Sequence, residues 1–419
     1  MLHPAEVDEE KKRRCGSLCI QEYPGDAKGR KKDMGKQKGR KITAVIVAAI
    51  LFIAALIYCN QVEKVELVST GGQSYEKAVV KEIIVDNLQE DGERYGNQEV
   101  ILEIKTGPMA GREMRAISPN GTLFGAACEV GMKVIAIVNV SEDTSLVTVY
   151  SQDRTAAIYG FVLFFALVVC LVGGKKGAKA MICLAFDGIA IFYILFPLVY
   201  RGFSPVWVTV FICVLATLFM MMMIGGVTSK TVSATVGTTC GVVAAGLSAL
   251  IFGHFAGISG YNVSDIETLN YIAQQTPIRI GELLFSGIIL SALGAVMDVG
   301  MSISSTIQEL YETNPSIGKK QLFLSGIHVG RDVMGTMVDT LILAYAGGAL
   351  STLVTNYAYD LSYNQLINSY IVGVEIMQGV AGSLGIVLTV PITAVVSVEL
   401  IYRRKKKKEK TKELDAIAG

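Results

Sequence analysis

The sequence predicts a polytopic α-helical membrane protein with about eight transmembrane helices and a small extracytoplasmic β-rich domain after the first helix. Three observations support this prediction. Several apolar stretches approach or exceed the roughly 20 residues that a helix needs to cross a bilayer. The composition is 51% hydrophobic and only 18% charged, with a mean hydropathy of +0.47. The 43 glycines suit membrane helices, which pack through close backbone approach.

The first apolar segment, Ile42–Cys59, follows a stretch that holds eight basic residues between Lys28 and Lys41. A cleavable signal peptide is the alternative interpretation, because signal sequences also combine a basic start with an apolar stretch. No cleavage pattern of small residues follows the segment. We therefore expect a retained transmembrane helix over 42–59 and a basic cytoplasmic tail over 1–41.

Seven further apolar stretches predict a transmembrane domain over 155–402. They are Thr155–Val172, Ala180–Tyr200, Pro205–Ile224, Thr231–Gly257, Glu282–Ser304, Val333–Val354 and about Glu375–Tyr402. Residues 321–332 are apolar but contain three charged or titratable residues, so either a re-entrant segment or the start of the seventh span fits them.

Charges between the spans predict the orientation. Lysines occupy alternate short loops. The only basic residues in the other short loops are Arg201 and Arg279. Basic loops stay in the cytoplasm, which places both termini there. Residues 403–419 carry 8 basic and 3 acidic side chains, as expected of a second basic cytoplasmic tail, whereas residues 60–154 carry 9 basic and 15 acidic ones.

The pattern of residues 60–154 predicts the extracytoplasmic β-rich domain. Six short runs have the composition of strands and are separated by Gly, Asn and Asp clusters, a spacing typical of a small barrel or a sandwich. The runs are Val62–Val68, Val79–Val85, Glu99–Lys105, Ala110–Ile117, Lys133–Val140 and Ser145–Ser151.

The sixth span carries a stripe of small and polar residues at helical spacing. Its members, three or four positions apart, are Gly287, Ser291, Gly294, Asp298, Ser302 and Ser305. One interpretation is a helix-packing seam, formed by Gly287, Ser291, Gly294 and Ser302, in which Asp298 bonds to a neighbouring helix. The other is a seam that also lines a polar pathway, because a carboxylate in hydrocarbon is costly and by default marks a functional site.

The seventh span repeats this pattern. His328, Asp332, Gly335 and Asp339 share one face, and Arg331 lies beside them as a counter-charge. We expect Asp298 and Asp339 to lie in the bundle interior within reach of Arg331 or His328. These five charged or titratable residues are the candidates for an ion or proton pathway. Elsewhere in the spans, Asp187 is near a loop, and Glu375 shares a face with Gln378, Gly379 and Gly382.

Several classes of function are disfavoured. His328 with the aspartates is compatible with a hard-cation site, but a histidine near a span end is more often an interfacial hydrogen-bonding group, so no metal ligands are assigned. The chain lacks the HExxH, GxSxG and P-loop patterns of common hydrolases and ATPases. We expect no catalytic residues, no enzymatic activity, no cofactor and no nucleic-acid partner.

Four motifs make the chain resemble the YibE/F family of bacterial multi-pass membrane proteins. They are Arg154–Ala157, Gly173–Met181, Gly294–Ser304 (GAVMDVGMSIS) and Gly330–Gly347 (GRDVMGTMVDTLILAYAG). The resemblance covers roughly residues 62–402. It implies a permease-type architecture in a bacterial plasma membrane, and it implies no particular substrate.

Two functions remain open. The first is a permease-like secondary transporter or channel whose intramembrane carboxylates handle an unknown small solute or ion. The second is a non-transporting membrane scaffold or accessory subunit, which uses its extracytoplasmic domain to bind an envelope partner protein. The lipid bilayer is a partner in both, and assembly into a homo-oligomer is compatible with either.

Overall fold

The structure is a computed structural model that describes residues 50, 52–65, 67, 71–90, 92–119, 124–140, 145–226, 228–263 and 265–418. The chain divides into two units after Val62. In the first unit, residues 52–60 are helical, as expected for the end of the first apolar segment. The predicted tail over 1–41 and residues 42–49 of that segment lie outside the described residues.

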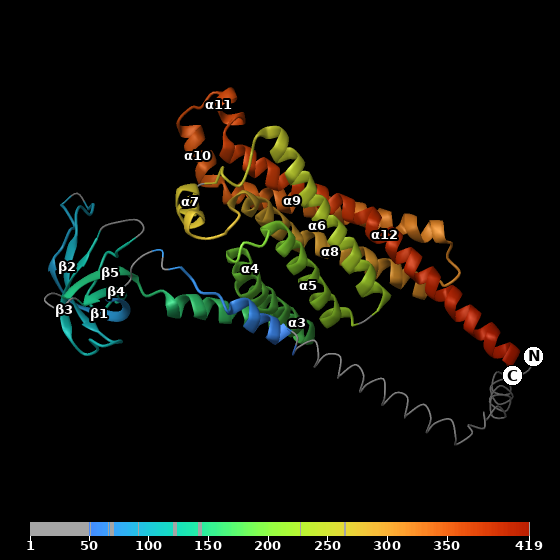
Figure 1. Ribbon diagram of the computed structural model, residues 1–419, viewed down its shortest axis with the longest axis horizontal. Coiled ribbons are helices and arrows are strands. Elements are labelled where there is room, and N and C mark those ends of the chain that lie inside the picture. Colours follow the sequence, from blue (N-terminus) through green and yellow to red (C-terminus); the bar gives the residue numbers. More distant parts are fainter. Residues whose placement is uncertain are drawn as a thin grey trace, which may run out of the picture. The chain divides into compact units, whose positions relative to one another are not determined.

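Five strands form a closed barrel in the order β1-β2-β3-β5-β4 (Figure 1). The strands are β1 (Gln73–Val85), β2 (Gln98–Ile104), β3 (Glu113–Ser118), β4 (Lys133–Val140) and β5 (Ser145–Gln152). Strands β3 and β5 are parallel, and the other four pairs are antiparallel. This is a five-stranded barrel of the OB type. The sequence left barrel and sandwich open, and the β1–β4 pairing that closes the sheet decides for the barrel.

Alternation of side chains explains how the barrel fills its interior. Along β2, Val100, Leu102 and Ile104 are fully buried, and the residues between them are only partly covered. Gln98 is also buried, and its side-chain oxygen accepts a hydrogen bond of 2.7 Å from the Cys128 backbone nitrogen. A buried amide is tolerated when it is paired in this way.

Three predicted strands differ from the structure. The described residues of Val62–Val68 form no strand, and β1 instead begins at Gln73, well before the predicted Val79. Strand β3 begins at Glu113, because residues 107–111 form a turn in which Gly111 has a φ of 83°. A left-handed backbone of this kind favours glycine and interrupts a strand.

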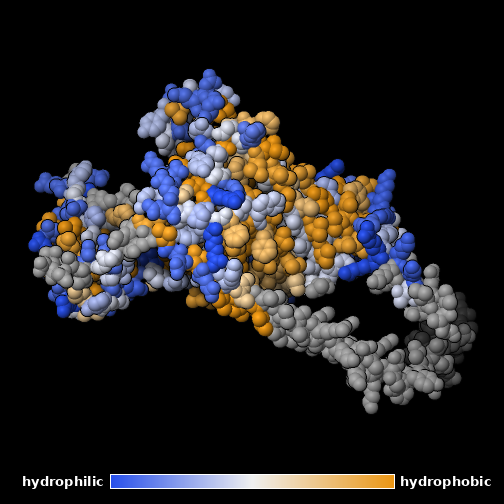
Figure 2. All heavy atoms as spheres, viewed as in Figure 1, coloured by the Kyte–Doolittle hydropathy of each residue, from blue (hydrophilic) through white to orange (hydrophobic). Residues whose placement is uncertain are grey.

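The remainder of the described chain is helical. The helices are α3 (Thr155–Ala190), a π-helical turn (Ile191–Leu195), α4 (Phe196–Tyr200), α5 (Pro205–Gly225), α6 (Ser229–Ala256), α7 (Ile266–Gln275), a 3₁₀ turn (Ile280–Glu282), α8 (Leu283–Thr313), α9 (Lys319–Gly348), α10 (Leu350–Ala358), α11 (Tyr363–Ile367) and α12 (Tyr370–Ala418). By length and composition, five helical segments of the described chain are able to cross a membrane, or six when the bent pair α9–α10 counts as one. Figure 2 shows hydrophobic side chains over the middle of the long helices and hydrophilic ones at their ends.

Helix α3 reverses direction at Gly174, whose φ and ψ are 52° and −132°. A Cβ on Gly177 would collide with the backbone oxygen of Val169, eight residues earlier. In a straight helix, eight residues span about 12 Å. The contact therefore requires a tight helical hairpin, in agreement with the two separate apolar stretches predicted on either side of the Lys175–Lys179 loop.

Helix α9 begins at Lys319 and includes all of residues 321–332, which settles their conformation as helical. It ends at Gly348, and α10 continues at an angle of 59°. The predicted span Val333–Val354 therefore contains a break near Ala349 that the apolar pattern did not indicate.

The core of the helical part lies between α6, α8, α9 and α12. Its fully buried members include Val242 on α6, Val296 and Ile303 on α8, Leu322 on α9 and Ile386 on α12. Close contact between α6 and α12 depends on Gly241, because a Cβ there would collide with the hydroxyl of Thr389 and lie 2.9 Å from the backbone oxygen of Gly385.

Candidate functional site

Helix α8 has an apolar buried face and a polar exposed one. Ile288, Val296 and Ile303 are on the buried face, which packs against the core. Gly287, Ser291, Gly294 and Asp298 are on the exposed face, and Ser302 is half-buried. A Cβ on Gly287 or Gly294 would meet no atom within 4 Å. The space beside these two glycines is therefore open, and the packing role of the predicted seam stays a prediction.

Helix α9 also presents its polar residues outward. His328, Arg331, Asp332, Gly335 and Asp339 are all exposed. The expectation that Asp298 and Asp339 lie in the bundle interior is therefore wrong for a single chain. The physical reason is that the opposite faces of α8 and α9 hold the larger apolar side chains, and those faces fill the core.

The charged groups of α8 and α9 form no ion pair with one another among the described residues. Neither Arg331 nor His328 contacts a carboxylate there, although we expected one of them to do so. These groups are thus exposed on α8 and α9 and are not joined into a network.

One hydrogen bond shows which residues of α8 and α9 lie at the same level along the two helices. The hydroxyl oxygens of Ser291 and Tyr345 lie 2.5 Å apart. Asp298 follows Ser291 by seven residues, and Asp339 precedes Tyr345 by six. Since these helices are antiparallel and rise about 1.5 Å per residue, both carboxylates lie at a similar level, about 10 Å from this bond toward the α8–α9 connection.

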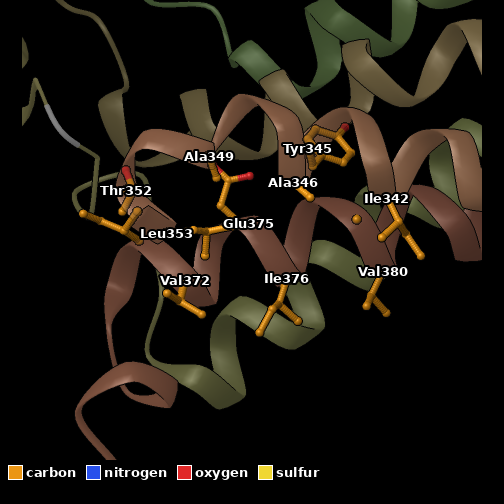
Figure 3. A pocket seen from close by; sticks show the side chains of 12 residues that line it. Ile342, Tyr345, Ala346, Ala349, Thr352, Leu353, Val372, Glu375, Ile376 and Val380 are labelled. Carbon is orange, nitrogen blue, oxygen red and sulfur yellow. The ribbon is translucent and has the colours of Figure 1, made fainter. Parts of the chain in front are cut away.

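A cavity of about 270 Å³ lies where α9, α10 and α12 meet (Figure 3). Its lining is Ile342, Tyr345, Ala346, Ala349, Thr352, Leu353, Ile371, Val372, Glu375, Ile376, Gly379 and Val380. The break after Gly348 turns α10 away from the α9 axis, and the small side chains of Ala346 and Ala349 leave the space open. No sequence pattern predicted this cavity, although small residues occur on both α9 and α12.

Among the described residues that line the cavity, Glu375 is the only charged one. The side chain is half-buried and has no hydrogen-bond or ion-pair partner among the described residues. Figure 3 shows its carboxyl group directed from α12 toward Ala349. The other polar lining groups are the hydroxyls of Tyr345 and Thr352. The oxygen atoms of these side chains contribute almost nothing to the cavity surface, which is nearly all apolar.

The tightest seam of small residues lies elsewhere, between α6 and α12. A Cβ on Gly237 would collide with Thr393, as one on Gly241 would with Thr389. The hydroxyl oxygens of Thr238 on α6 and of Thr393 and Ser397 on α12 are buried without a hydrogen-bond partner. The sequence held the signal for this seam, because small residues recur at every fourth position at 237, 241, 245 and 249 and at 385, 389, 393 and 397.

Asp187 is a further acidic residue within the helical part. It is half-buried on α3, and its Oδ1 atom has no hydrogen-bond partner. The π-helical turn over Ile191–Leu195 begins four residues later. No group of three or more His, Cys, Asp or Glu side chains in the described part of the chain is arranged to hold a metal ion.

The comparisons with known proteins agree with the sequence motifs. No curated protein and no solved structure matches the chain. The family model described as YibE/F-like protein matches residues 161–403, which is more than half of the chain. This match confirms the resemblance that the motifs indicated. The protein belongs to the YibE/F-like family.

Proposed function

We propose that the protein is a permease-like secondary transporter in a bacterial plasma membrane, with no enzymatic activity. The observation that carries this proposal is the break between α9 and α10, which lines a cavity together with Glu375 on α12. Discontinuous helices form the solute and ion sites of many secondary transporters, because their ends present unpaired backbone groups inside the membrane.

Asp298 and Asp339 support the same proposal. Both are exposed in long apolar helices, at a similar level on the α8–α9 pair. Carboxylates at membrane depth are costly, and they are generally kept where they face water, an ion or a partner. The proposed path for protons or a cation therefore follows the exposed side of α8 and α9, with Asp332, His328 and Arg331 nearer its cytoplasmic end.

The proposed topology has eight crossings and both termini in the cytoplasm. The segment Thr155–Tyr200 has 46 residues, which would extend about 69 Å as one helix, whereas the hydrocarbon core is about 30 Å thick. Its reversal at Gly174 supplies two crossings instead. The first apolar segment, α5, α6, α8, the α9–α10 pair and α12 supply the other six.

Proteoliposomes that enclose a pH-sensitive dye test transport. We expect the native protein to change the internal pH when a cation gradient is imposed, and the double variant Asp298→Asn with Asp339→Asn to lose this response. Glu309→Gln is the matched control, because Glu309 is an exposed carboxylate near the end of α8 and should leave the response intact. A double variant as active as the native protein would exclude these acids from coupling.

A non-transporting scaffold is the second candidate, and the open face of α8 favours it. Gly287 and Gly294 are exposed without neighbours, which would let a helix of another chain approach closely. This reading predicts that Gly294→Leu disrupts a native complex, measured by mass spectrometry in detergent. A complex that persists in Gly294→Leu would remove the support that this face gives to the scaffold reading.

A further inference from the structure

We propose that a basic cluster, where α9 begins and the apolar stretch of α12 ends, binds the headgroup of an anionic phospholipid. The acyl chains of this lipid would lie along exposed apolar side chains of the same two helices. The basic cluster consists of Lys319 and Lys320 on α9 and of Arg403 and Lys406 on α12. The inference concerns lipid binding alone, so it does not depend on the transport proposal.

Contacts between α9 and α12 hold the two halves of the basic cluster together. The Lys319 Nζ atom lies 2.5 Å from the Oε2 atom of Glu399, and the Arg403 Nε atom lies 2.9 Å from the Oε1 atom of the same carboxylate. The Tyr402 hydroxyl donates a hydrogen bond to the backbone oxygen of Ile317, just before α9 begins. These contacts fasten the start of α9 to α12, so the cations of both helices stay close together.

The charge of the basic cluster is not balanced by neighbouring acids. Glu399 is a single carboxylate shared between two cations, and Lys320 and Lys406 have no ion-pair partner among the described residues. Glu309 and Glu312 lie near the end of the neighbouring α8, but in the part of the chain that the structure describes neither pairs with the cluster. The cluster therefore attracts an anion, and Lys and Arg form strong charge-assisted hydrogen bonds with phosphate oxygens.

Exposed apolar side chains continue from the basic cluster along both helices, which favours a lipid over a soluble anion. On α12, Val395 precedes Glu399 by four residues and Lys406 follows it by seven, so the three share one helical face. Val395 is 55% exposed, and on α9 Leu324, one turn after Lys320, is 43% exposed. Cations beside an exposed apolar surface match the phosphate and the acyl chains of a phospholipid, and basic residues that flank a membrane helix attract anionic lipids.

Native mass spectrometry of the full-length protein in detergent measures the affinity for each lipid. The probes are dioleoylphosphatidylglycerol, which is anionic, and dioleoylphosphatidylcholine, which has the same acyl chains and no net charge. Glycerophosphoglycerol, the anionic headgroup without acyl chains, is added as a competitor. We expect phosphatidylglycerol to bind at least about tenfold more tightly than phosphatidylcholine. The competitor should not displace it at equal concentration, because it lacks the acyl chains that contact α9 and α12.

Two double variants of equal charge assign the binding to the basic cluster. Lys320→Gln with Lys406→Gln removes the two cations without an ion pair, so Glu399 keeps both of its contacts and α9 stays joined to α12. This variant should bind phosphatidylglycerol about tenfold more weakly and phosphatidylcholine as before. Lys175→Gln with Lys176→Gln is the control, because both lysines are exposed in the turn of the α3 hairpin. The control should bind both lipids as the native protein does.

Equal affinity of the native protein for the two lipids would overturn the proposal, since the net charge of the headgroup would then contribute nothing. Undiminished binding of phosphatidylglycerol to Lys320→Gln with Lys406→Gln would overturn it as well. So would an equal loss of binding in both double variants, because the lipid would then respond to the total charge of the protein and not to this cluster. Displacement of the lipid by glycerophosphoglycerol would assign the cluster to a soluble phosphate ester instead.

Discussion

Glycines of this chain have two different roles, although they occur at the same helical spacing. Gly241 lies where α6 meets α12, and a Cβ there would collide with Thr389. Gly294 has the same spacing on α8, and nothing lies within 4 Å of its Cβ position. The neighbouring side chains, and not the spacing, decide what each glycine does.

Gly241→Ala should therefore destabilise the protein, by about 1–3 kcal/mol as for overpacking of a core. Gly294→Ala should have no such cost and should slightly favour its helix, because alanine has the higher helix propensity. Thermal unfolding in the same detergent compares the two variants. Equal melting temperatures for both variants would contradict the α6–α12 contact.

Asp86 provides a pH-dependent contribution to the stability of the barrel. The side-chain amide of Gln98 donates a hydrogen bond of 2.9 Å to its carboxylate, and the Arg94 guanidinium lies 2.6 Å away, so the pKa of Asp86 lies below its ordinary value of 3.8. The unfolded chain then binds a proton more readily than the folded one. The stabilisation is complete above a pH of about 3.8 and is lost as the pH falls through the lower folded pKa.

Modification of the buried Cys128 thiol by 4,4′-dithiodipyridine, followed by mass spectrometry, reports opening of the barrel. The modification rate should rise as the pH falls below about 3.8, after correction for the rate of a free thiol. Asp86→Asn should be modified faster at neutral pH, and it should show a smaller rise in acid. An unchanged pH profile in this variant would exclude Asp86 as the source.

At the scale of the element, the hairpin in α3 depends on two glycines with separate tasks. Gly174 adopts a left-handed φ of 52°, and Gly177 allows the second arm to approach Val169. A side chain at the first position costs about 1–3 kcal/mol in backbone strain. At the second it prevents the close approach of the two arms.

Gly177→Val should lower the melting temperature of the protein, because its side chain would collide with the first arm. Gly173→Ala is the matched control, since nothing lies within 4 Å of that Cβ position. Size-exclusion chromatography after heating measures the folded fraction. If the Gly177→Val and Gly173→Ala proteins had the same melting temperature, the two arms of the hairpin would not meet at this point.

The break between α9 and α10 illustrates a limit of sequence patterns at the same scale. No charged residue interrupts the stretch from Leu341 to Val354, so its composition predicts one span. The backbone nevertheless bends by 59° near Ala349. The run of small residues at 346–349 lets the chain bend there, and packing against α12 decides where it does so.

At the scale of the whole molecule, the proposed topology puts the barrel and the α3 hairpin turn on opposite sides of the membrane. Single cysteines at Gln89 and Lys176, in a background without the eight native cysteines, should react with a membrane-impermeant maleimide from opposite sides of intact cells. Gln89 should react from outside, and Lys176 only after permeabilisation. Reaction of both from outside would exclude the eight-span arrangement.

Some properties of this protein follow from the sequence alone because they depend on local patterns. Apolar length identifies the long helices, alternation identifies most of the barrel strands, and the motifs around Asp298 and Asp339 identify the family. These signals require only a residue's neighbours along the chain, which is why they survive without knowledge of the fold.

Tertiary structure decided what depends on complementary surfaces. Stripes of small residues occur on α6, α8 and α12. The α6 stripe with Gly237 and Gly241 faces side chains of α12 that fit it, those of Thr393 and Thr389. The stripe with Gly294 and Asp298 consequently stays exposed, because the larger apolar side chains of α8 gain more by packing in the core. The cavity at Glu375 likewise exists only because three helices meet around a bend, and no segment contains that information by itself.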